Sequence, residues 1–298
     1  MTTGLGSMSY SRDFFKDILD RTLGDEVKIL SVSPVSGGCI HHAQKITTDK
    51  GLYFIKLNQS LDLNMFRTEY SGLELLAEAN EIDVPGPIGY GIESDQAYLL
   101  TEYVDSRNRN SNFWVDFGQS LANLHMNHQN DRYGLSYNNY IGRLDQYNDF
   151  HDNWVSFFIY HRLEVQIKLA FDKGYIDTTY LERFSRFYKK LSDLLPEEPP
   201  SLLHGDLWSG NFMTGENGQP VIIDPAVYYG NREIELSFTQ MFGGFDTLFY
   251  QAYQEVYPLS PGFEGRVEIY NLYPYLVHVN MFGTSYLSGV DRVVKKYV

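Results

Sequence analysis

The chain has 298 residues, of which 43% are hydrophobic and 21% are charged, as is typical of a folded globular protein. Its formal net charge of -14 argues against nucleic acid as a partner, because an acidic surface repels a phosphate backbone, and it weakly favours cationic substrates. The single cysteine, Cys39, excludes an intrachain disulfide and indicates a reducing, cytoplasmic compartment. No apolar run approaches the roughly 18 residues that a membrane helix needs, so we expect no membrane partner.

Residues 1–8 lack the apolar core of a signal peptide and end in a second methionine, Met8. We expect them to be a cloning scar and begin fold prediction at residue 9. From residue 9 to residue 103 the sequence predicts a strand-rich lobe. Its expected elements, in chain order, are a short amphipathic helix over 11–23, strands over 27–35, 40–47 and 52–57, a helix around 65–77, and strands over 88–92 and 97–103.

After residue 103 the hydrophobic pattern changes to helical periodicity, which predicts a second, mainly helical lobe over 104–298. Helices are expected over 113–124, 154–171, 180–194, 233–253 and 267–287, and a short strand over 221–224. The stretch 130–149 is aperiodic and rich in tyrosine, asparagine and glycine. A connection of that length is more often functional than idle.

The segment from His204 to Asn211, with Ile223 and Asp224 after it, carries the strongest functional signal. Asp206 is followed by Asn211 five positions later and by Asp224 a further thirteen positions on. A phosphotransferase needs a carboxylate that accepts the proton of the attacking hydroxyl, and a carboxamide and a second carboxylate that hold magnesium against the nucleotide phosphates. We therefore interpret Asp206 as the catalytic base and Asn211 and Asp224 as the metal ligands. Each residue alone could be a surface, turn or capping residue, but their joint spacing favours catalysis.

A lysine near the end of the third predicted strand is the candidate for holding phosphates. Lys56 could reach the α- and β-phosphates of a nucleotide, and Glu69, on the apolar face of the next helix, is its expected partner because a charge there needs one. The alternative is an exposed edge-strand lysine and a solvated glutamate.

Two glycines, Gly37 and Gly38, lie between the first two predicted strands, where their backbone amides could cover the phosphates. A glycine pair at such a place is more often a plain hairpin turn. Beside them, Cys39 is either an inert small residue or a redox-sensitive thiol that could also link two chains into a dimer.

Three further positions complete the candidate site. Glu102, Tyr103 and Val104 end the fifth predicted strand, and their backbone groups could bind the adenine edge of a nucleotide. Trp208 lies between the base and the first metal ligand and is expected to line the acceptor pocket, although a core tryptophan is nearly as good an interpretation. His204 is the weakest substrate candidate and is better explained as a hydrogen-bonding residue of the loop.

These residues lie within strings that resemble the fructosamine kinase family, which belongs to the wider protein-kinase-like and aminoglycoside-phosphotransferase group. The most specific strings are HGDLWSGN (204–211) and IDPAVYYGNREIELSFTQMFGGF (223–245). Similar strings occur upstream: GGCI (37–40), FIKLN (54–58), NYIG (139–142) and FFIYHRLEVQ (157–166). The resemblance covers nearly the whole chain after residue 8.

The resemblance implies a bilobal, protein-kinase-like α+β fold, with a five-stranded antiparallel sheet and one main helix in an N-terminal nucleotide-binding lobe and a mainly helical C-terminal catalytic lobe. It implies ATP and Mg²⁺, and phosphorylation of the 3-hydroxyl of ketosamines formed by glycation. The product falls apart and releases the amine, so the activity would amount to deglycation repair. Fructosamines, ribulosamines and erythrulosamines, free or protein-bound, all stay open as acceptors, as does the oligomeric state.

Two alternatives remain from the sequence. One is a small-molecule kinase for aminoglycosides, choline or another amino-alcohol, which would share the Asp206 and Asn211 pattern. The other is a nucleotide-binding scaffold without catalysis, against which the complete set of Asp206, Asn211 and Asp224 argues.

Overall fold

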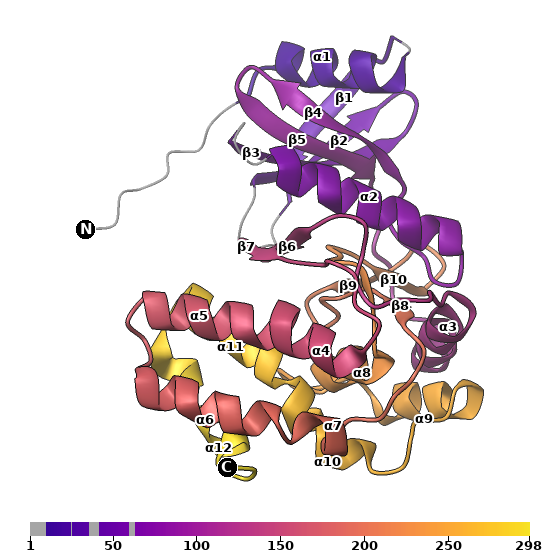
Figure 1. The fold of residues 1–298 in the computed structure, drawn as a ribbon. Coiled ribbons are helices and arrows are strands. Elements are labelled where there is room, and N and C mark those ends of the chain that lie inside the picture. The colour runs from indigo at the N-terminus through magenta and orange to yellow at the C-terminus, as the bar shows by residue number, and fades with distance from the viewer. Residues whose placement is uncertain (1–9, 25, 36–41, 60–62) are drawn as a thin grey trace. The chain divides into compact units, whose positions relative to one another are not determined.

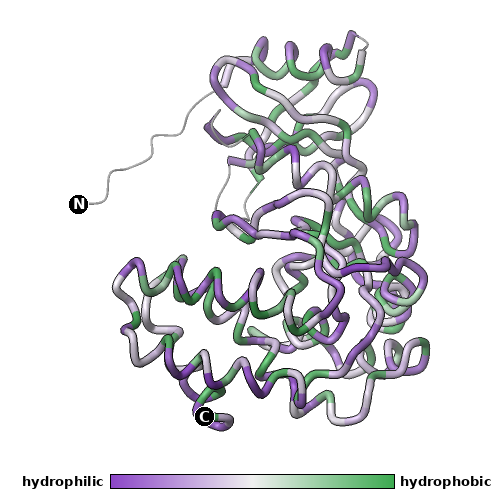
Figure 2. Tube along the Cα trace, in the orientation of Figure 1, coloured by the Kyte–Doolittle hydropathy of each residue, from purple (hydrophilic) through white to green (hydrophobic). Residues whose placement is uncertain are grey.

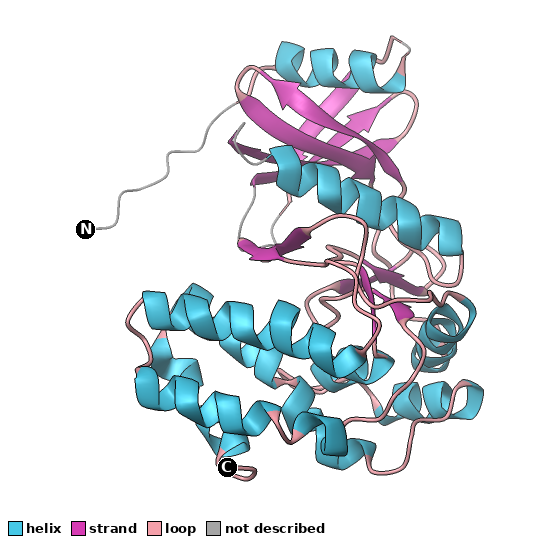
Figure 3. Cartoon of the chain, in the orientation of Figure 1, coloured by secondary structure: helices cyan, strands magenta, loops and turns pink. Residues whose placement is uncertain are grey.

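The computed structural model describes residues 10–24, 26–35, 42–59 and 63–298 of the chain. Two compact units make up the chain. The first combines Met1–Glu74 with Pro85–Asp105, and the second combines Leu75–Val84 with Ser106–Val298. The first unit is rich in strands and the second in helices (Figure 3).

The first unit is built on a five-stranded antiparallel sheet. Its elements, in chain order, are α1 (Arg12–Leu23), β1 (Ile29–Pro34), β2 (His42–Thr48), β3 (Leu52–Gln59), α2 (Leu63–Ala79), β4 (Pro87–Glu93) and β5 (Gln96–Glu102). Residues 75–79 of α2 belong to the second unit. The strand order is β1-β2-β3-β5-β4, and every neighbouring pair is antiparallel, which confirms the predicted sheet.

Helix α1 covers one face of this sheet (Figure 1). It begins where the Ser11 hydroxyl accepts a hydrogen bond from the main-chain N–H of Phe14 at 3.1 Å, and it ends at Gly24, whose φ of 71° suits a left-handed cap. Its apolar stripe is buried while its other face stays polar, an alternation that is visible along its trace in Figure 2.

Side chains of β3 alternate between the two faces of the sheet, and this alternation places the candidate lysine. Ile55 and Leu57 pack in the core that α1 shares with the sheet. Lys56 lies between them in sequence and therefore points to the opposite face, which α2 covers through the packing of Phe66 on Leu99 of β5. The period of the strand thus directs the Lys56 ammonium toward α2.

The described residues of the second unit form helices and three two-stranded antiparallel sheets, β6 with β7, β8 with β11 and β9 with β10. Its elements, in chain order, are α3 (Phe113–Asn127), β6 (Asn139–Ile141), β7 (Leu144–Gln146), α4 (Trp154–Phe157), π-helix η2 (Phe158–Leu163), α5 (Glu164–Asp172), α6 (Thr178–Tyr188), α7 (Leu191–Leu194), β8 (Ser201–Leu203), β9 (Phe212–Thr214), β10 (Pro220–Ile222), β11 (Tyr228–Gly230), α8 (Arg232–Thr239), α9 (Thr247–Val256), α10 (Phe263–Tyr270), α11 (Leu272–Phe282), 3₁₀-helix η3 (Thr284–Tyr286) and α12 (Leu287–Val294). Figure 1 labels most of them.

Several long helices that the periodicity predicts are interrupted, and those predictions were wrong in detail. The helix expected over 233–253 breaks between α8 and α9, where Gly243 and Gly244 take positive φ values of 101° and 71° that no right-handed helix contains. The helix expected over 267–287 breaks before α11, because Pro274 has no N–H to donate to the preceding turn, and it ends at Gly283.

The helix expected over 154–171 and the aperiodic stretch 130–149 also differ from expectation. The helix contains the π-helical turn η2, and the aperiodic stretch contains the hairpin of β6 and β7. Neither feature has a signature in hydrophobic periodicity, since a π-turn adds a single residue and the hairpin strands have three residues each. Among the described residues, no helix is long and apolar enough to cross a lipid bilayer.

Candidate active site

Two short antiparallel strand pairs bring the predicted catalytic residues together. Strand β8 pairs with β11, and β9 pairs with β10. In an antiparallel pair, the end of one strand lies opposite the start of the other. The chain segment that leaves β8 at His204 therefore meets the segment that enters β11 at Val227, and Asn211 before β9 meets Ile223 after β10.

Asn211 is the residue that joins the set. Its side-chain amide donates hydrogen bonds to the Asp206 carbonyl at 2.8 Å and to the Asp206 carboxylate oxygen Oδ2 at 2.9 Å. The main-chain carbonyl of Asn211 accepts a hydrogen bond from the main-chain N–H of Ile223 at 3.0 Å. Asp224 is the next residue after Ile223, so this bond brings Asp224 close to Asn211. The structure thus places Asp206, Asn211 and Asp224 at one point of the second unit, as their spacing predicted.

The Asp206 carboxyl lies in an environment that disfavours its charge. Burial raises the pKa of Asp206 well above its usual range, and the negative charge of Asp224 raises it further, while the hydrogen bond from Asn211 acts in the opposite direction. A raised pKa makes the carboxylate a better proton acceptor. Asp224 itself has a φ of 56°, a left-handed conformation that costs energy for a residue other than glycine and occurs preferentially at functional sites.

His204 holds the two catalytic segments in register. Its ring is fully buried, its Nε2–H donates to the Ile223 carbonyl at 2.8 Å, and its Nδ1 accepts the main-chain N–H of Asp206 at 3.2 Å. This pattern requires the neutral ring, and burial lowers the pKa of His204 accordingly. With both nitrogens used, no polar atom of His204 is left for a substrate, so we treat it as a positioning residue.

The chain passes so close to itself here that Gly205 is required. Gly205 has a φ of 85°, and a Cβ at this position would lie 2.0 Å from the carbonyl oxygen of Ala226. The segment carrying Asp206 and the segment carrying Asp224 are therefore in direct backbone contact, which a side chain at position 205 would prevent.

Glu235, on helix α8, accepts hydrogen bonds from the main chain of the catalytic loop, and the sequence did not predict this role. Its carboxylate accepts main-chain hydrogen bonds from Gly205 at 2.7 Å and from His204 at 3.2 Å, and it pairs with the buried His125 ring at 2.8 Å. Burial by itself raises the pKa of Glu235, but the hydrogen bonds and the charge of His125 outweigh this effect, so the pKa is lowered and the group stays ionised. Glutamates in the string REIE suggest a solvated helix face, which is why periodicity did not single out Glu235.

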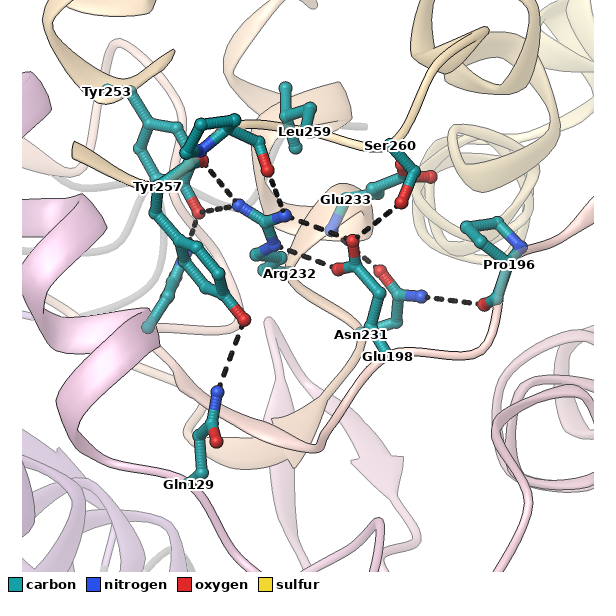
Figure 4. Close-up of polar contacts among 12 residues, drawn as sticks. Gln129, Pro196, Glu198, Asn231, Arg232, Glu233, Tyr253, Tyr257, Leu259 and Ser260 are labelled. Carbon is teal, nitrogen blue, oxygen red and sulfur yellow. Dashed lines mark hydrogen bonds and ion pairs between the residues drawn. The ribbon is translucent and has the colours of Figure 1, made fainter. Parts of the chain in front are cut away.

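Helix α8 is itself anchored at its N-terminus by a buried arginine (Figure 4). Arg232 donates two hydrogen bonds to the Glu198 carboxylate at 2.8 and 3.0 Å and one each to the carbonyls of Tyr257 and Pro258 at 2.6 and 2.7 Å. The Asn231 side chain caps the helix by accepting a hydrogen bond from the main-chain N–H of Glu233 at 2.9 Å. A bidentate arginine–carboxylate pair is rigid, so the helix that carries Glu235 is fixed in place.

A second buried polar network lies under the segment that follows Asp224. Gln146 donates to the Ala226 carbonyl at 3.0 Å, Asn139 donates to the Val227 carbonyl at 2.8 Å, and Tyr273 donates to the Gln146 side chain at 2.8 Å. These residues come from the hairpin of β6 and β7 and from α11, elements whose role hydrophobic periodicity could not indicate. The strings NYIG and FFIYHRLEVQ pointed to this region only through the family resemblance.

The π-helix η2 delivers an arginine to the same network. Arg162 is fully buried and donates to the Asn148 side chain at 2.8 Å and to the Tyr147 carbonyl at 2.7 Å. Its guanidinium also lies 4.0 Å from the centroid of the Tyr228 ring. A π-turn rotates the following side chains relative to an α-helix, and such turns are frequent at functional sites.

A largely apolar pocket opens beside the Asp206 carboxyl. Its lining residues are Ile141, Leu203, Gly205, Asp206, Leu207, Tyr228, Ile234, Glu235, Phe238, Tyr273, Pro274, Val277 and His278. Trp208 is not among them. Its ring instead meets that of Phe242 edge-on with centroids 5.8 Å apart. A pocket that combines apolar walls with a few polar groups is the usual form of a small-molecule site.

In the first unit, the predicted lysine and glutamate form an ion pair. The Lys56 ammonium lies 2.6 Å from Glu69 Oε1, and the two side chains are only 11% and 13% exposed. The hydrogen bond to Glu69 holds the Lys56 ammonium in one direction.

The other first-unit candidates are less informative. The main-chain N–H groups of Glu102 and Tyr103 donate within the unit, to the carbonyls of Gly86 at 2.9 Å and Leu52 at 3.0 Å. Among the described residues, the main-chain N–H of Val104 donates no hydrogen bond to another main-chain carbonyl. The candidates Gly37 and Gly38, and the neighbouring Cys39, lie outside the described residues.

A family model described as fructosamine kinase matches residues 13–298. The chain belongs to the fructosamine kinase family. A probable ketoamine kinase from Synechocystis is 37% identical to it over 278 residues, which cover 93% of this chain and 94% of the relative. A rice protein named protein-ribulosamine 3-kinase, chloroplastic, is 36% identical over 284 residues, which cover 93% of this chain and 81% of the relative.

Solved structures agree with this family assignment. The crystal structure of a provisionally named fructosamine-3-kinase from Haemophilus somnus matches with a TM-score of 0.86 and 28% identity, covering 96% of this chain and 97% of the other. A choline kinase from Streptococcus pneumoniae, at 16% identity and a TM-score of 0.62, covers 96% of this chain and 98% of its own, and shares the fold. The predicted protein-kinase-like α+β fold is thereby confirmed for this fructosamine kinase family member.

Proposed function

We propose that this chain is an ATP-dependent kinase that phosphorylates the 3-hydroxyl of ketosamines, the adducts that sugars form with amines. The observation that carries the proposal is the contact between Asp206 and Asn211 beside an apolar pocket, in a chain of the fructosamine kinase family. Because a 3-phosphorylated ketosamine decomposes and releases its amine, the activity would serve deglycation repair.

Asp206 supplies the acid–base step of the proposed reaction. The acceptor hydroxyl loses its proton to the Asp206 carboxylate as its oxygen bonds to the γ-phosphorus of ATP, while the bond between that phosphorus and ADP breaks. The proton remains on Asp206 until solvent removes it. Burial and the neighbouring Asp224 charge, which raise the pKa of Asp206, support its assignment as the proton acceptor.

Asn211 and Asp224 have the donor atoms that suit Mg²⁺. The side-chain amide nitrogen of Asn211 donates both of its hydrogen bonds to Asp206. The side-chain oxygen of Asn211 therefore remains for a metal, and Asp224 offers a carboxylate. Hard divalent cations bind such oxygen ligands. When bound, Mg²⁺ would neutralise negative charge on the transferring phosphate.

The first unit carries the other residues proposed for nucleotide binding. The ordered ammonium of Lys56, oriented by Glu69, supports a role in binding phosphate oxygens. We propose Gly37 and Gly38 as the cover of the phosphates. The adenine edge would use backbone groups of the segment 102–104, chiefly those of Val104, because the N–H groups of the preceding two residues already donate within the unit.

The acceptor class is proposed to include protein-bound adducts, because relatives that are 36% identical carry the name protein-ribulosamine 3-kinase. The presence of a single cysteine, Cys39, supports the proposal that the enzyme acts in a reducing, cytoplasmic compartment. A dimer linked through oxidised Cys39 stays a prediction.

Replacing the proposed base tests the assignment. We expect Asp206→Ala to lower kcat for a ketoamine acceptor by about 10² to 10⁴-fold, the usual share of a general base, while ATP affinity stays close to that of the wild type. Turnover is measured by ADP release and ATP affinity by calorimetry. Asp193→Ala, at an exposed position of α7, is the control and should change neither quantity. Near-normal turnover of Asp206→Ala would refute the role of the base.

A further inference from the structure

A cluster of aromatic side chains surrounds one histidine of the acceptor pocket. His278, on α11, lines the pocket together with Asp206. The centroid of its ring lies 5.1 Å from that of Phe242, 5.4 Å from that of Phe282 and 5.1 Å from that of Tyr286. We call these four residues the His278 cluster.

The hydrogen bonding of His278 defines which of its ring nitrogens is available as an acceptor. His278 Nδ1 lies 2.7 Å from the carbonyl oxygen of Pro274. A carbonyl oxygen can only accept, so Nδ1 carries the hydrogen. Burial lowers the pKa of His278 and favours the neutral ring, whose Nε2 is then a bare acceptor. Among the described residues, Nε2 has no hydrogen-bond partner.

The two phenylalanines of the cluster are exposed although they are large and apolar. Phe242 is 46% exposed and Phe282 is 58% exposed, and both contact His278, which lines the pocket. Phe242 also has a φ of 54°, a strained conformation for a large side chain that tends to persist at ligand-binding sites. Exposed apolar surface at the edge of a pocket is a feature of binding sites.

No cation of the described part of the chain occupies these rings. The cation–π contacts within it involve other rings, such as those of Tyr228, Tyr257 and Tyr103. No lysine or arginine of the described residues therefore competes for the rings of the His278 cluster, and the net charge of -14 attracts a cation from outside.

We propose that the His278 cluster binds the protonated amine of the ketosamine, with His278 Nε2 accepting a hydrogen bond from the ammonium and the rings of Phe242, Phe282 and Tyr286 contacting the cation and the chain attached to it. This inference rests on the proposed function. In a ketosamine the amine and the 3-hydroxyl are attached to the two carbons that flank the keto carbon, so a hydroxyl at Asp206 places the amine in the same pocket. The cluster would make the enzyme prefer glycated amines to free sugars.

Two acceptors that differ at one atom test this proposal. One is a ribulose adduct of a primary alkylamine, and the other is the same molecule with an ether oxygen in place of the nitrogen, which is neutral and cannot donate. A hydrogen bond to a charged group contributes about 1.5–3 kcal/mol, so we expect the wild type to prefer the amine by at least about tenfold in kcat/KM.

Two substitutions of His278 separate the two ring nitrogens. In His278→Asn the amide occupies the position of Nδ1 and can still donate to the Pro274 carbonyl, but the acceptor at Nε2 is gone. In His278→Gln an amide oxygen can occupy the position of Nε2. We expect His278→Asn to lose most of the amine preference through a higher KM for the amine, and His278→Gln to keep a large part of it, with kcat changed little in either variant.

The rings are tested by Phe282→Leu, which keeps apolar area but removes the aromatic face. Cation–π contacts at exposed sites contribute about 0.5–1 kcal/mol, so the amine preference should fall by a factor of about two to five. Phe171→Leu, at another exposed phenylalanine on α5, is the matched control and should retain the wild-type preference.

The outcomes separate this inference from the proposed function. If wild type phosphorylates the ketosamine but His278→Asn keeps the full amine preference while melting and binding ATP normally, the amine site is overturned and the kinase assignment stands. If wild type phosphorylates neither acceptor, both proposals fail. Loss of the preference in His278→Asn with retention in His278→Gln supports the assignment, and equal loss in both variants with normal kcat overturns the role of Nε2.

Discussion

At the scale of single residues, Asp206 shows how a reactive group is obtained at the expense of stability. Its carboxyl is buried beside the carboxyl of Asp224, and both effects raise its pKa. A carboxyl whose pKa is higher in the folded than in the unfolded chain stabilises the fold fully only below its unfolded pKa of about 3.9. That contribution is lost as the pH rises through the folded pKa.

This linkage predicts a stabilising substitution. In the absence of metal and nucleotide, Asp206→Asn should raise the melting temperature by a few degrees at pH 8, because the amide carries no charge to bury next to Asp224. At pH 4, where the wild-type carboxyl is largely protonated, the two proteins should melt at similar temperatures. Thermal unfolding followed by circular dichroism at both pH values measures this difference. A lower melting temperature of Asp206→Asn at pH 8 would contradict it.

Residue spacing predicted the residues that meet, but not those that support them. The set of Asp206, Asn211 and Asp224 could be found because the chemistry demands these side-chain types on one loop and one strand end. The ion pair of Lys56 and Glu69 followed from a charge placed on an apolar helix face, and its role toward phosphates stays a prediction.

His278 illustrates the opposite case. Its sequence neighbours are those of an ordinary apolar helix, and only the bond to Pro274 and the surrounding rings give it a distinctive environment. Pro274, Phe282 and Tyr286 lie within eight positions of His278, and Phe242 joins them from another part of the chain. The sequence does not indicate that this part of the chain lines the pocket that contains Asp206.

At the scale of elements, helix α8 is the support of the catalytic loop. Glu235 accepts two main-chain hydrogen bonds from the residues before Asp206, and Glu233 on the same helix binds Arg266 away from the loop. The two glutamates are both buried and both paired, and they differ in what they hold. They therefore form a matched pair for experiment.

We expect Glu235→Gln to lower kcat by about 10 to 100-fold, because one of the two N–H groups loses its acceptor and Asp206 shifts relative to the acceptor hydroxyl. The KM for ATP should change by less than about threefold, since the first unit is unaffected. Both substitutions remove a charge from a buried pair, so Glu233→Gln should lower the melting temperature about as much as Glu235→Gln does. Glu233→Gln should nevertheless leave kcat within about threefold of the wild type. Equal losses of kcat in both variants would show that Glu235 acts only through stability.

Element boundaries were predictable where hydrophobic periodicity met a clear terminator, and not elsewhere. The five strands and α1 were found because alternation, Ser11 and Gly24 define them locally. The breaks at Gly243 and before Pro274 lie within continuous apolar patterns, where backbone geometry overrides periodicity. The π-turn that delivers Arg162 has no sequence signature at all.

At the scale of the whole molecule, the fold is shared with kinases of different acceptors. The choline kinase from Streptococcus pneumoniae has the same fold at 16% identity. The fold therefore cannot identify the acceptor, which must follow from the pocket and the family. The fold class was accessible from the sequence because five strands, one helix and a helical remainder in that order are characteristic, whereas acceptor recognition depends on the pocket side chains.

The most direct test of the account is the identity of the phosphorylated acceptor. Ribulose-lysine and fructose-lysine are assayed side by side with choline and an aminoglycoside, by ADP release and by phosphorus NMR of the product. We expect kcat/KM for at least one ketoamine to exceed that for choline or the aminoglycoside by roughly 100-fold or more, with the phosphate on the 3-hydroxyl. Phosphorylation of choline or the aminoglycoside without phosphorylation of either ketoamine would contradict the account.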